Sequence, residues 1–144
     1  MTPEELNEQT KEDWRDLGFF YDYDNSKACW QLIGSRTGLL RFCDILIEYT
    51  ANDRKKKLSE HEHYGPYWYL KLVTWNAPVI TPHDIRGTFE DFRRLSSLTR
   101  EKIAHAFPGD RVEIDKEYSS GNEAILLFEV REDSFDPASG DPLV

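Results

Sequence analysis

Residues 19–51 read FFYDYDNSKACWQLIGSRTGLLRFCDILIEYTA and contain two strand patterns followed by a helix pattern. Residues 19–24 alternate in the two-residue period of a β-strand, and a second β-rich run, residues 29–33, follows a short polar turn. The two runs predict a β-hairpin. Ser35 then precedes residues 36–51, where apolar side chains recur at three- and four-residue spacing, so we expect a well-buried helix that begins after a serine cap.

A third strand pattern lies in residues 59–75, SEHEHYGPYWYLKLVTW. Because side chains alternate along a strand, a central strand over residues 67–75 would have two faces. One would carry Trp68, Leu70 and Leu72, and the other would carry Tyr67, Tyr69, Val73 and Trp75. The prolines at positions 78 and 82 restrict the next segment to a loop or an edge strand.

The remaining pattern predicts a second long helix and a second hairpin. Thr88 with Asp91 three residues later indicates a helix N-terminus, and Pro108 stops the helix. Residues 112–114 and 124–130 read as two strands around a polar turn.

The two ends of the chain have little to bury. Thr2 and Pro3 predict a helix start, and Gly18 a helix end, but apolar residues are sparse between them, so we expect a short or loosely docked helix. Residues 132–144 contain two prolines, a glycine and little periodicity, and we expect a mobile acidic tail. The ordered core is predicted over residues 14–131.

Together these elements predict a single α+β domain, residues 1–144. We expect a mostly antiparallel sheet of about five to six strands, two long helices packed on one face, and a short N-terminal helix.

Composition narrows the function classes. The chain has 144 residues and a net charge of −9, with no apolar run of membrane-spanning length. Its acidity argues against nucleic acid or an anionic membrane as a partner. The polar N-terminus and the two cysteines, Cys29 and Cys43, are typical of a reduced, cytoplasmic protein.

A histidine pair suggests metal binding. In an extended chain His61 and His63 point to the same side, which suits two nitrogen ligands of one metal. A site needs a further ligand, for which His83 is a candidate, and the spacing matches no established zinc motif. We therefore expect no bound cofactor and keep a metal-dependent enzyme as an alternative.

Aromatic side chains form the second candidate surface. Tyr64, Tyr67, Tyr69 and Trp75 would form an exposed patch beside His61 and His63 if helices leave that strand face uncovered. Tyrosine and tryptophan are enriched at protein interfaces. If helices cover both sheet faces, these rings are core instead.

From about Trp14 to Ala138 the chain resembles a group of small uncharacterised bacterial proteins. The resemblance rests on WRDLGFFYD, GSRTGLLRFCD, SEHEHYGPYWYLKLVTW, the Ile85–Thr88 turn and FDPAS. Small acidic α+β proteins of this kind are similar to immunity proteins of bacterial polymorphic toxin systems. The resemblance implies a protein partner, such as a toxin.

The sequence thus favours a non-enzymatic protein-binding domain, for which the resemblance implies an immunity-type inhibitor. Two alternatives stay open: a metal-binding protein or metal-dependent enzyme that uses His61 and His63, and a homo-oligomeric module that uses the same aromatic face.

Overall fold

The computed structural model describes residues 1–144 as three α-helices, eight strands and three short 3-10 turns. The helices are α1 (Pro3–Leu17), α2 (Arg36–Thr50) and α3 (Phe89–Ala104). The strands are β1 (Phe20–Asp24), β2 (Cys29–Ser35), β3 (His61–Tyr64), β4 (Leu70–Thr74), β5 (Val79–Ile80), β6 (Ile85–Gly87), β7 (Arg111–Ile114) and β8 (Ile125–Arg131). The 3-10 turns are η1 (Asp53–Lys56), η2 (Pro66–Trp68) and η3 (Pro137–Gly140).

Each helix begins directly after the capping residue that the sequence predicts. The hydroxyls of Thr2, Ser35 and Thr88 accept hydrogen bonds from backbone N–H groups three residues further on. Asp91 completes the cap of α3, because its carboxylate accepts from the Thr88 N–H. None of the three helices has the length and apolar character that crossing a membrane requires.

The α+β class is confirmed, but the prediction of one antiparallel sheet is wrong. The strands form two four-stranded mixed sheets, in the orders β1-β2-β8-β7 and β3-β4-β6-β5. Both predicted hairpins are present as antiparallel pairs, β1 with β2 and β7 with β8. Each sheet also contains a parallel pair, β2 with β8 and β4 with β6. Hairpins follow from local sequence, whereas the β2–β8 pairing sets Cys29 opposite Ile125 and depends on packing between distant segments.

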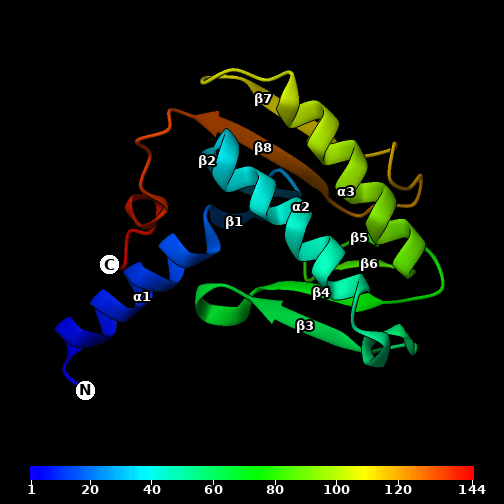
Figure 1. The fold of residues 1–144 in the computed structure, drawn as a ribbon, viewed down its shortest axis with the longest axis horizontal. Coiled ribbons are helices and arrows are strands. Elements are labelled where there is room, and N and C mark those ends of the chain that lie inside the picture. The colour runs from blue at the N-terminus through cyan, green and yellow to red at the C-terminus, as the bar shows by residue number, and fades with distance from the viewer.

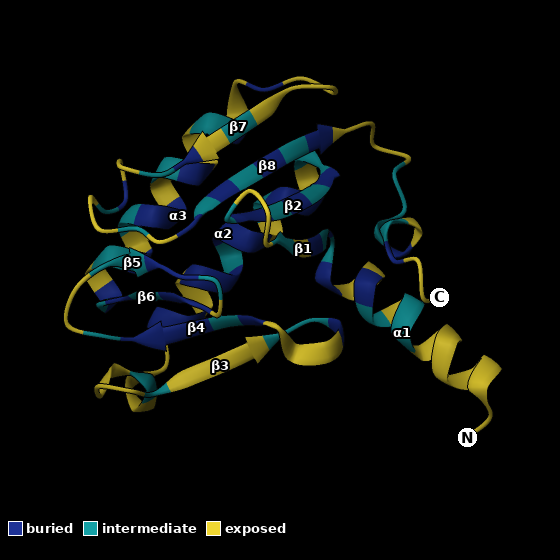
Figure 2. Cartoon of the chain, turned by 180° about the vertical axis from the view of Figure 1, so that it is seen from behind, coloured by how far each residue is buried: buried dark blue, intermediate teal, exposed yellow.

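Helices α2 and α3 cover one face of the first sheet. Figure 1 shows them side by side across β2 and β8, and from behind the same strands lie in front of the helices (Figure 2). The core between these layers includes fully buried Leu32, Phe42, Leu46, Phe92 and Phe128. The two helices thus cover a four-stranded sheet, whereas the prediction placed two long helices on a single sheet of five to six strands.

The two sheets meet at the end of β5. The carbonyl oxygen of Ile80 accepts hydrogen bonds from the N–H groups of Glu123 and Ala124, just before β8. The indole N–H of Trp30, in β2, donates to the carbonyl oxygen of Thr81 at 2.8 Å. Strand β3 lies at the outer edge of the second sheet, where its side chains are largely exposed (Figure 2).

Both chain ends differ from the expectation of loose segments. Helix α1 has 15 residues and buries Trp14 and Leu17. The segment around η3 packs on α1 near the C-terminus (Figure 1), with Ala138 and Asp141 each 5 % exposed. Residues 136–141 therefore pack on α1 instead of forming a mobile tail, because Asp136 binds Arg15 and Asp141 accepts from the Trp14 indole N–H.

Candidate functional site

Residues 65–69, between β3 and β4, form a turn with an unusual backbone. Gly65, Tyr67 and Trp68 have φ angles of 72°, 65° and 61°. Left-handed conformations cost bulky residues on the order of 1–3 kcal/mol each and persist only where the surroundings impose them. Such strain is concentrated at functional sites, so this segment, named here the aromatic turn, is the first candidate.

Contacts from two strands hold the aromatic turn in place. The Tyr21 hydroxyl donates to the carbonyl oxygen of Pro66 and accepts from the Tyr69 N–H at 3.2 Å. Burial raises the pKa of Tyr21, so its hydroxyl keeps the proton that it donates. The Nδ1 of His63, in β3, lies 2.9 Å from the carbonyl oxygen of Trp68, which requires that Nδ1 carry the proton.

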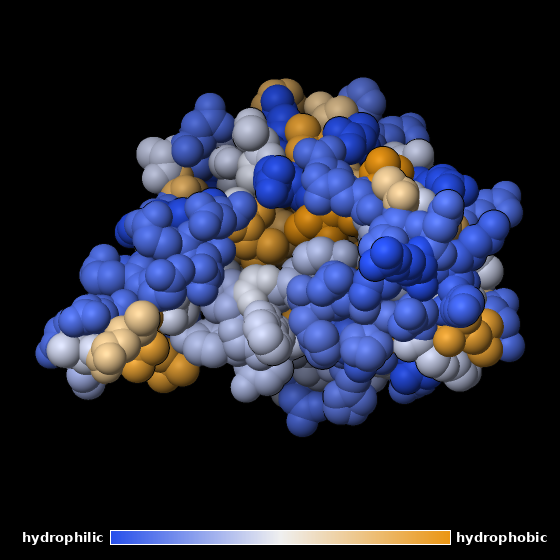
Figure 3. Space-filling view, turned by 60° about the horizontal axis from the view of Figure 1, so that its bottom comes forward, coloured by the Kyte–Doolittle hydropathy of each residue, from blue (hydrophilic) through white to orange (hydrophobic).

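The turn exposes three consecutive aromatic side chains. Tyr67 is 45 % exposed, Trp68 70 % and Tyr69 68 %. Most of the surface in Figure 3 is hydrophilic; tyrosine and tryptophan take pale colours on its scale, so the hydrophobic hollow near the centre of that view is formed by other residue types. The predicted strand over residues 67–75 is wrong at its start, because β4 begins at Leu70. Trp68 therefore lies on the surface, not on a buried face.

Of the other two predicted aromatic residues, Tyr64 lines a groove together with Trp68, whereas Trp75 lies apart from this patch. Tyr64 is half-buried at the end of β3, and burial strongly raises its pKa. Trp75 follows the far end of β4, about 20 Å from Tyr69 at the rise of an extended chain. Its ring stacks under the guanidinium of Arg86, 5.4 Å from the ring centroid. The sequence predicted that Trp75 shares a strand face with Tyr67 and Tyr69. In the structure those two residues precede β4, which begins at Leu70, so they share no strand face with Trp75.

His61 and His63 do lie on the same side of β3. Their ring centroids are 5.3 Å apart, and the Nδ1 of His61 lies 3.3 Å from the carbonyl oxygen of Ser59. Both Nδ1 atoms thus face backbone carbonyls, which leaves Nε2 as the free nitrogen of each ring. Lys71 lies opposite His63 in the sheet, so a cationic side chain occupies the neighbouring position.

The third predicted metal ligand lies elsewhere. His83, in the loop between β5 and β6, lines a pocket with Tyr67 and Tyr69. No cluster of three or more histidine, cysteine, aspartate or glutamate side chains in the chain has the geometry to hold a metal ion.

This pocket has a volume of about 410 Å³ and lies beneath the aromatic turn. Its walls include the rings of Trp14, Tyr21, Tyr23, Trp30, Tyr67 and Tyr69. These rings touch one another: the Trp14 centroid is 5.1 Å from that of Tyr21, and the Trp30 centroid 5.3 Å from that of Tyr23. The C-terminal residues 141–143 close one side.

Asp141 is a buried carboxylate in the lining of this pocket. Its Oδ2 accepts hydrogen bonds from the Trp14 indole N–H at 2.9 Å and from the Tyr67 hydroxyl at 2.6 Å. Its Oδ1 accepts from the N–H of Leu143 at 2.8 Å. Burial by itself raises the pKa of Asp141, but these three hydrogen bonds outweigh it and the pKa is lowered. Burial and the same contact raise the pKa of Tyr67 to about 12, so a carboxylate faces a neutral phenol.

Sequence reasoning missed most of this pocket. Trp14 was expected in a short or loosely docked helix and Asp141 in a mobile tail, and Tyr21 and Tyr23 were given no role in a site. One local signal existed: Asp136-Pro137 and Asp141-Pro142 are turn dipeptides. Each aspartate accepts a hydrogen bond from the N–H two residues further on.

Comparison of the chain with protein-family models, curated proteins and solved structures found no match. The resemblance to small bacterial proteins therefore stays a prediction, and the site must be interpreted from its own geometry.

Proposed function

We propose that this chain is a non-enzymatic protein-binding domain and that the aromatic turn is the centre of its interface. The observation that carries the proposal is the exposure of Tyr67, Trp68 and Tyr69 on one strained and tethered backbone. Tyrosine and tryptophan bury large areas at low entropic cost and dominate the energetics of interfaces. Because Tyr21 and His63 already hold the backbone, binding would not have to order this turn.

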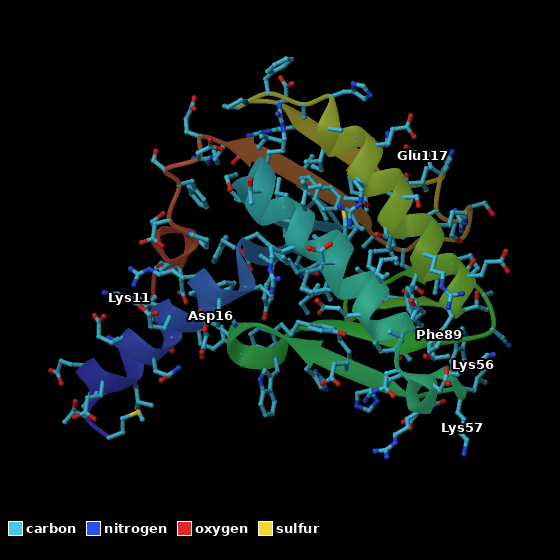
Figure 4. The ribbon with its side chains drawn as sticks, in the orientation of Figure 1. Lys11, Asp16, Lys56, Lys57, Phe89 and Glu117 are labelled. Carbon is cyan, nitrogen blue, oxygen red and sulfur yellow. The ribbon has the colours of Figure 1, made fainter.

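The surroundings of the turn favour a basic partner. A groove beside Trp68 is lined by three acidic residues, Asp13, Asp16 and Glu48, against one arginine, Arg41. Asp16 lies on α1, whereas Lys56 and Lys57 point outward at the opposite end of β3 (Figure 4). Charge complementarity increases association rates and selects partners. The partner would therefore present basic side chains around an apolar centre.

We extend the proposal to an immunity-type inhibitor that covers a toxin. Its support is the acidic, aromatic surface together with the resemblance described for the sequence. The test is coexpression with a toxic protein encoded beside this chain. Wild-type protein should protect the cells, and a variant with both Trp68 and Tyr69 replaced by alanine should not.

Trp68→Ala is expected to weaken binding to the partner at least about 30-fold, because a central aromatic contact contributes about 2 kcal/mol or more. The fold should be unaffected, since the ring is 70 % exposed. The measurement is retention of a protein from an extract of the source cells, followed by calorimetry with the purified partner.

Phe107→Ala is the matched control, because Phe107 is 68 % exposed and lies beyond the end of α3. Equal retention by both variants would place the interface elsewhere. A second copy of the chain as the retained protein would favour the homo-oligomeric alternative.

The metal-binding alternative rests on the exposed His61–His63 pair. We expect no stoichiometric zinc, because two ligands provide half of a tetrahedral site and the structure adds no third. Elemental analysis of protein purified without a chelator or a metal-affinity tag measures this. Stoichiometric metal that disappears in the His61→Ala, His63→Ala double variant would make the metal-dependent reading the leading one.

A further inference from the structure

Arginine side chains cover several aromatic rings of this chain. Their guanidinium carbons lie 5.1–5.9 Å from the ring centroids of Trp75, Phe89, Phe107, Tyr118 and Phe135. None of these rings belongs to the pocket beneath the aromatic turn, whose lining contains no lysine or arginine. The pocket is therefore lined by tyrosine and tryptophan rings and has no cation of its own.

The charge inside the pocket is negative. Its lining has two carboxylates, Asp141 and Asp22, and its other non-tyrosine ionisable side chain is His83. Asp141 is 95 % removed from solvent, and its lowered pKa keeps it ionised at neutral pH. All three hydrogen-bond partners of Asp141 are neutral donors, so no positive charge compensates the carboxylate.

The shape of the pocket suits a compact ligand. Trp14, Tyr21 and Trp30 are at most 3 % exposed, whereas Tyr67 and Tyr69 are partly exposed. Buried rings thus form the inner wall and exposed rings the outer one. The volume of about 410 Å³ lies within the range of small-molecule sites.

We propose that this pocket binds an organic cation of the alkylammonium class. An ammonium group is attracted to the faces of tryptophan and tyrosine, and the attraction increases where water is excluded. The Asp141 carboxylate adds charge complementarity at the inner wall. This binding site goes beyond the proposed protein interface, because the chain forms the pocket by itself and Trp68 lies outside it.

The experiment is a titration of the full ¹⁵N-labelled chain with choline, followed through the four indole N–H signals. The signals of Trp14 and Trp30 should shift saturably, while those of Trp68 and Trp75 act as internal controls outside the pocket. The neutral isostere 3,3-dimethyl-1-butanol should bind about tenfold more weakly, because it lacks the positive charge. Sodium chloride is added to the isostere titration so that its ionic strength matches that of the choline titration. A titration with n-butylammonium tests whether a primary alkylammonium also binds.

Tyr69→Ala should weaken choline binding about fivefold by removing an exposed wall, and Asp22→Asn should weaken it by removing a charge. Phe107→Ala and Trp68→Ala should leave it unchanged. Trp68→Ala distinguishes the two proposals, because it should weaken binding of the protein partner but not binding of choline. Equal binding of the neutral isostere, shifts spread over all four indoles, or no saturable shift would overturn the proposal.

Discussion

Gly65→Ala is expected to destabilise the chain by about 3 kcal/mol or more and to displace the aromatic turn. Gly65 has φ 72° and ψ −176°, a region that is essentially restricted to glycine. A Cβ there would lie 2.8 Å from Leu17 Cδ2 and 2.8 Å from Tyr21 Cε2. Neither neighbour can yield easily, because both side chains are buried. Backbone strain and overpacking therefore both contribute to the loss of stability.

Gly109→Ala is the matched control for this effect. Gly109 has φ 97°, and a Cβ would meet nothing within 4 Å. It therefore measures the cost of a positive φ alone, about 1 kcal/mol. Urea unfolding of both variants gives the comparison, provided that the m-values agree. Equal losses of stability would show that packing of Gly65 against Leu17 and Tyr21 has no energetic weight.

The same substitution tests the assignment of the site. Where Gly65→Ala remains folded, it should lose both the protein partner and choline, because Tyr67 moves away from Asp141. Loss of only one of the two, the protein partner or choline, would show that the aromatic turn and the pocket do not depend on each other.

The helix boundaries could be predicted because their signals are local. Ser35 and Thr88 cap helices through hydrogen bonds to residues three positions away, within reach of a sequence pattern. The order of the strands could not, since β2 lies between β1 and β8 for reasons of packing against α2. Alternation identifies a strand, but it does not identify the neighbours of that strand.

The aromatic turn shows where the alternation pattern fails. Residues 67–75 consist almost entirely of residue types common in strands, yet the chain becomes extended only from Leu70. The Gly65-Pro66 dipeptide was a turn signal, and the buried Tyr21 hydroxyl fixes the turn from another strand. The contact between Tyr21 in β1 and Pro66 in η2 cannot be predicted from the sequence of either segment alone.

Asp141→Ala is expected to cost about 3 kcal/mol of folding stability, although the sequence analysis predicted a mobile tail for this segment. Trp14 is 1 % exposed, and the substitution leaves its indole N–H without an acceptor. A buried donor without a partner costs about 1–3 kcal/mol, and hydrogen bonds to a charged group are the stronger ones. The Tyr67 hydroxyl loses its acceptor in the same step. Urea unfolding at neutral pH measures the loss.

Asp136→Asn is the control from the same segment. Asp136 pairs with Arg15 at 3.1 Å, but both side chains are more than 40 % exposed, and exposed ion pairs contribute little. A loss of stability in Asp136→Asn as large as that in Asp141→Ala would attribute the effect to the segment as a whole, not to the Trp14–Asp141–Tyr67 contacts.

The contribution of Asp141 should also depend on pH. Because the pKa of Asp141 is lower in the folded chain than in the unfolded one, ionisation stabilises the fold above the unfolded value of about 3.9. That stability is lost as the pH falls through the folded pKa. Asp141→Asn removes the titration, and its amide cannot accept from all three donors, so it should be less stable than wild type at pH 7. The difference should shrink as the pH falls from 7 to below the unfolded value of about 3.9. A difference that stays constant over this range would show that Asp141 is not held as a carboxylate by Trp14 and Tyr67.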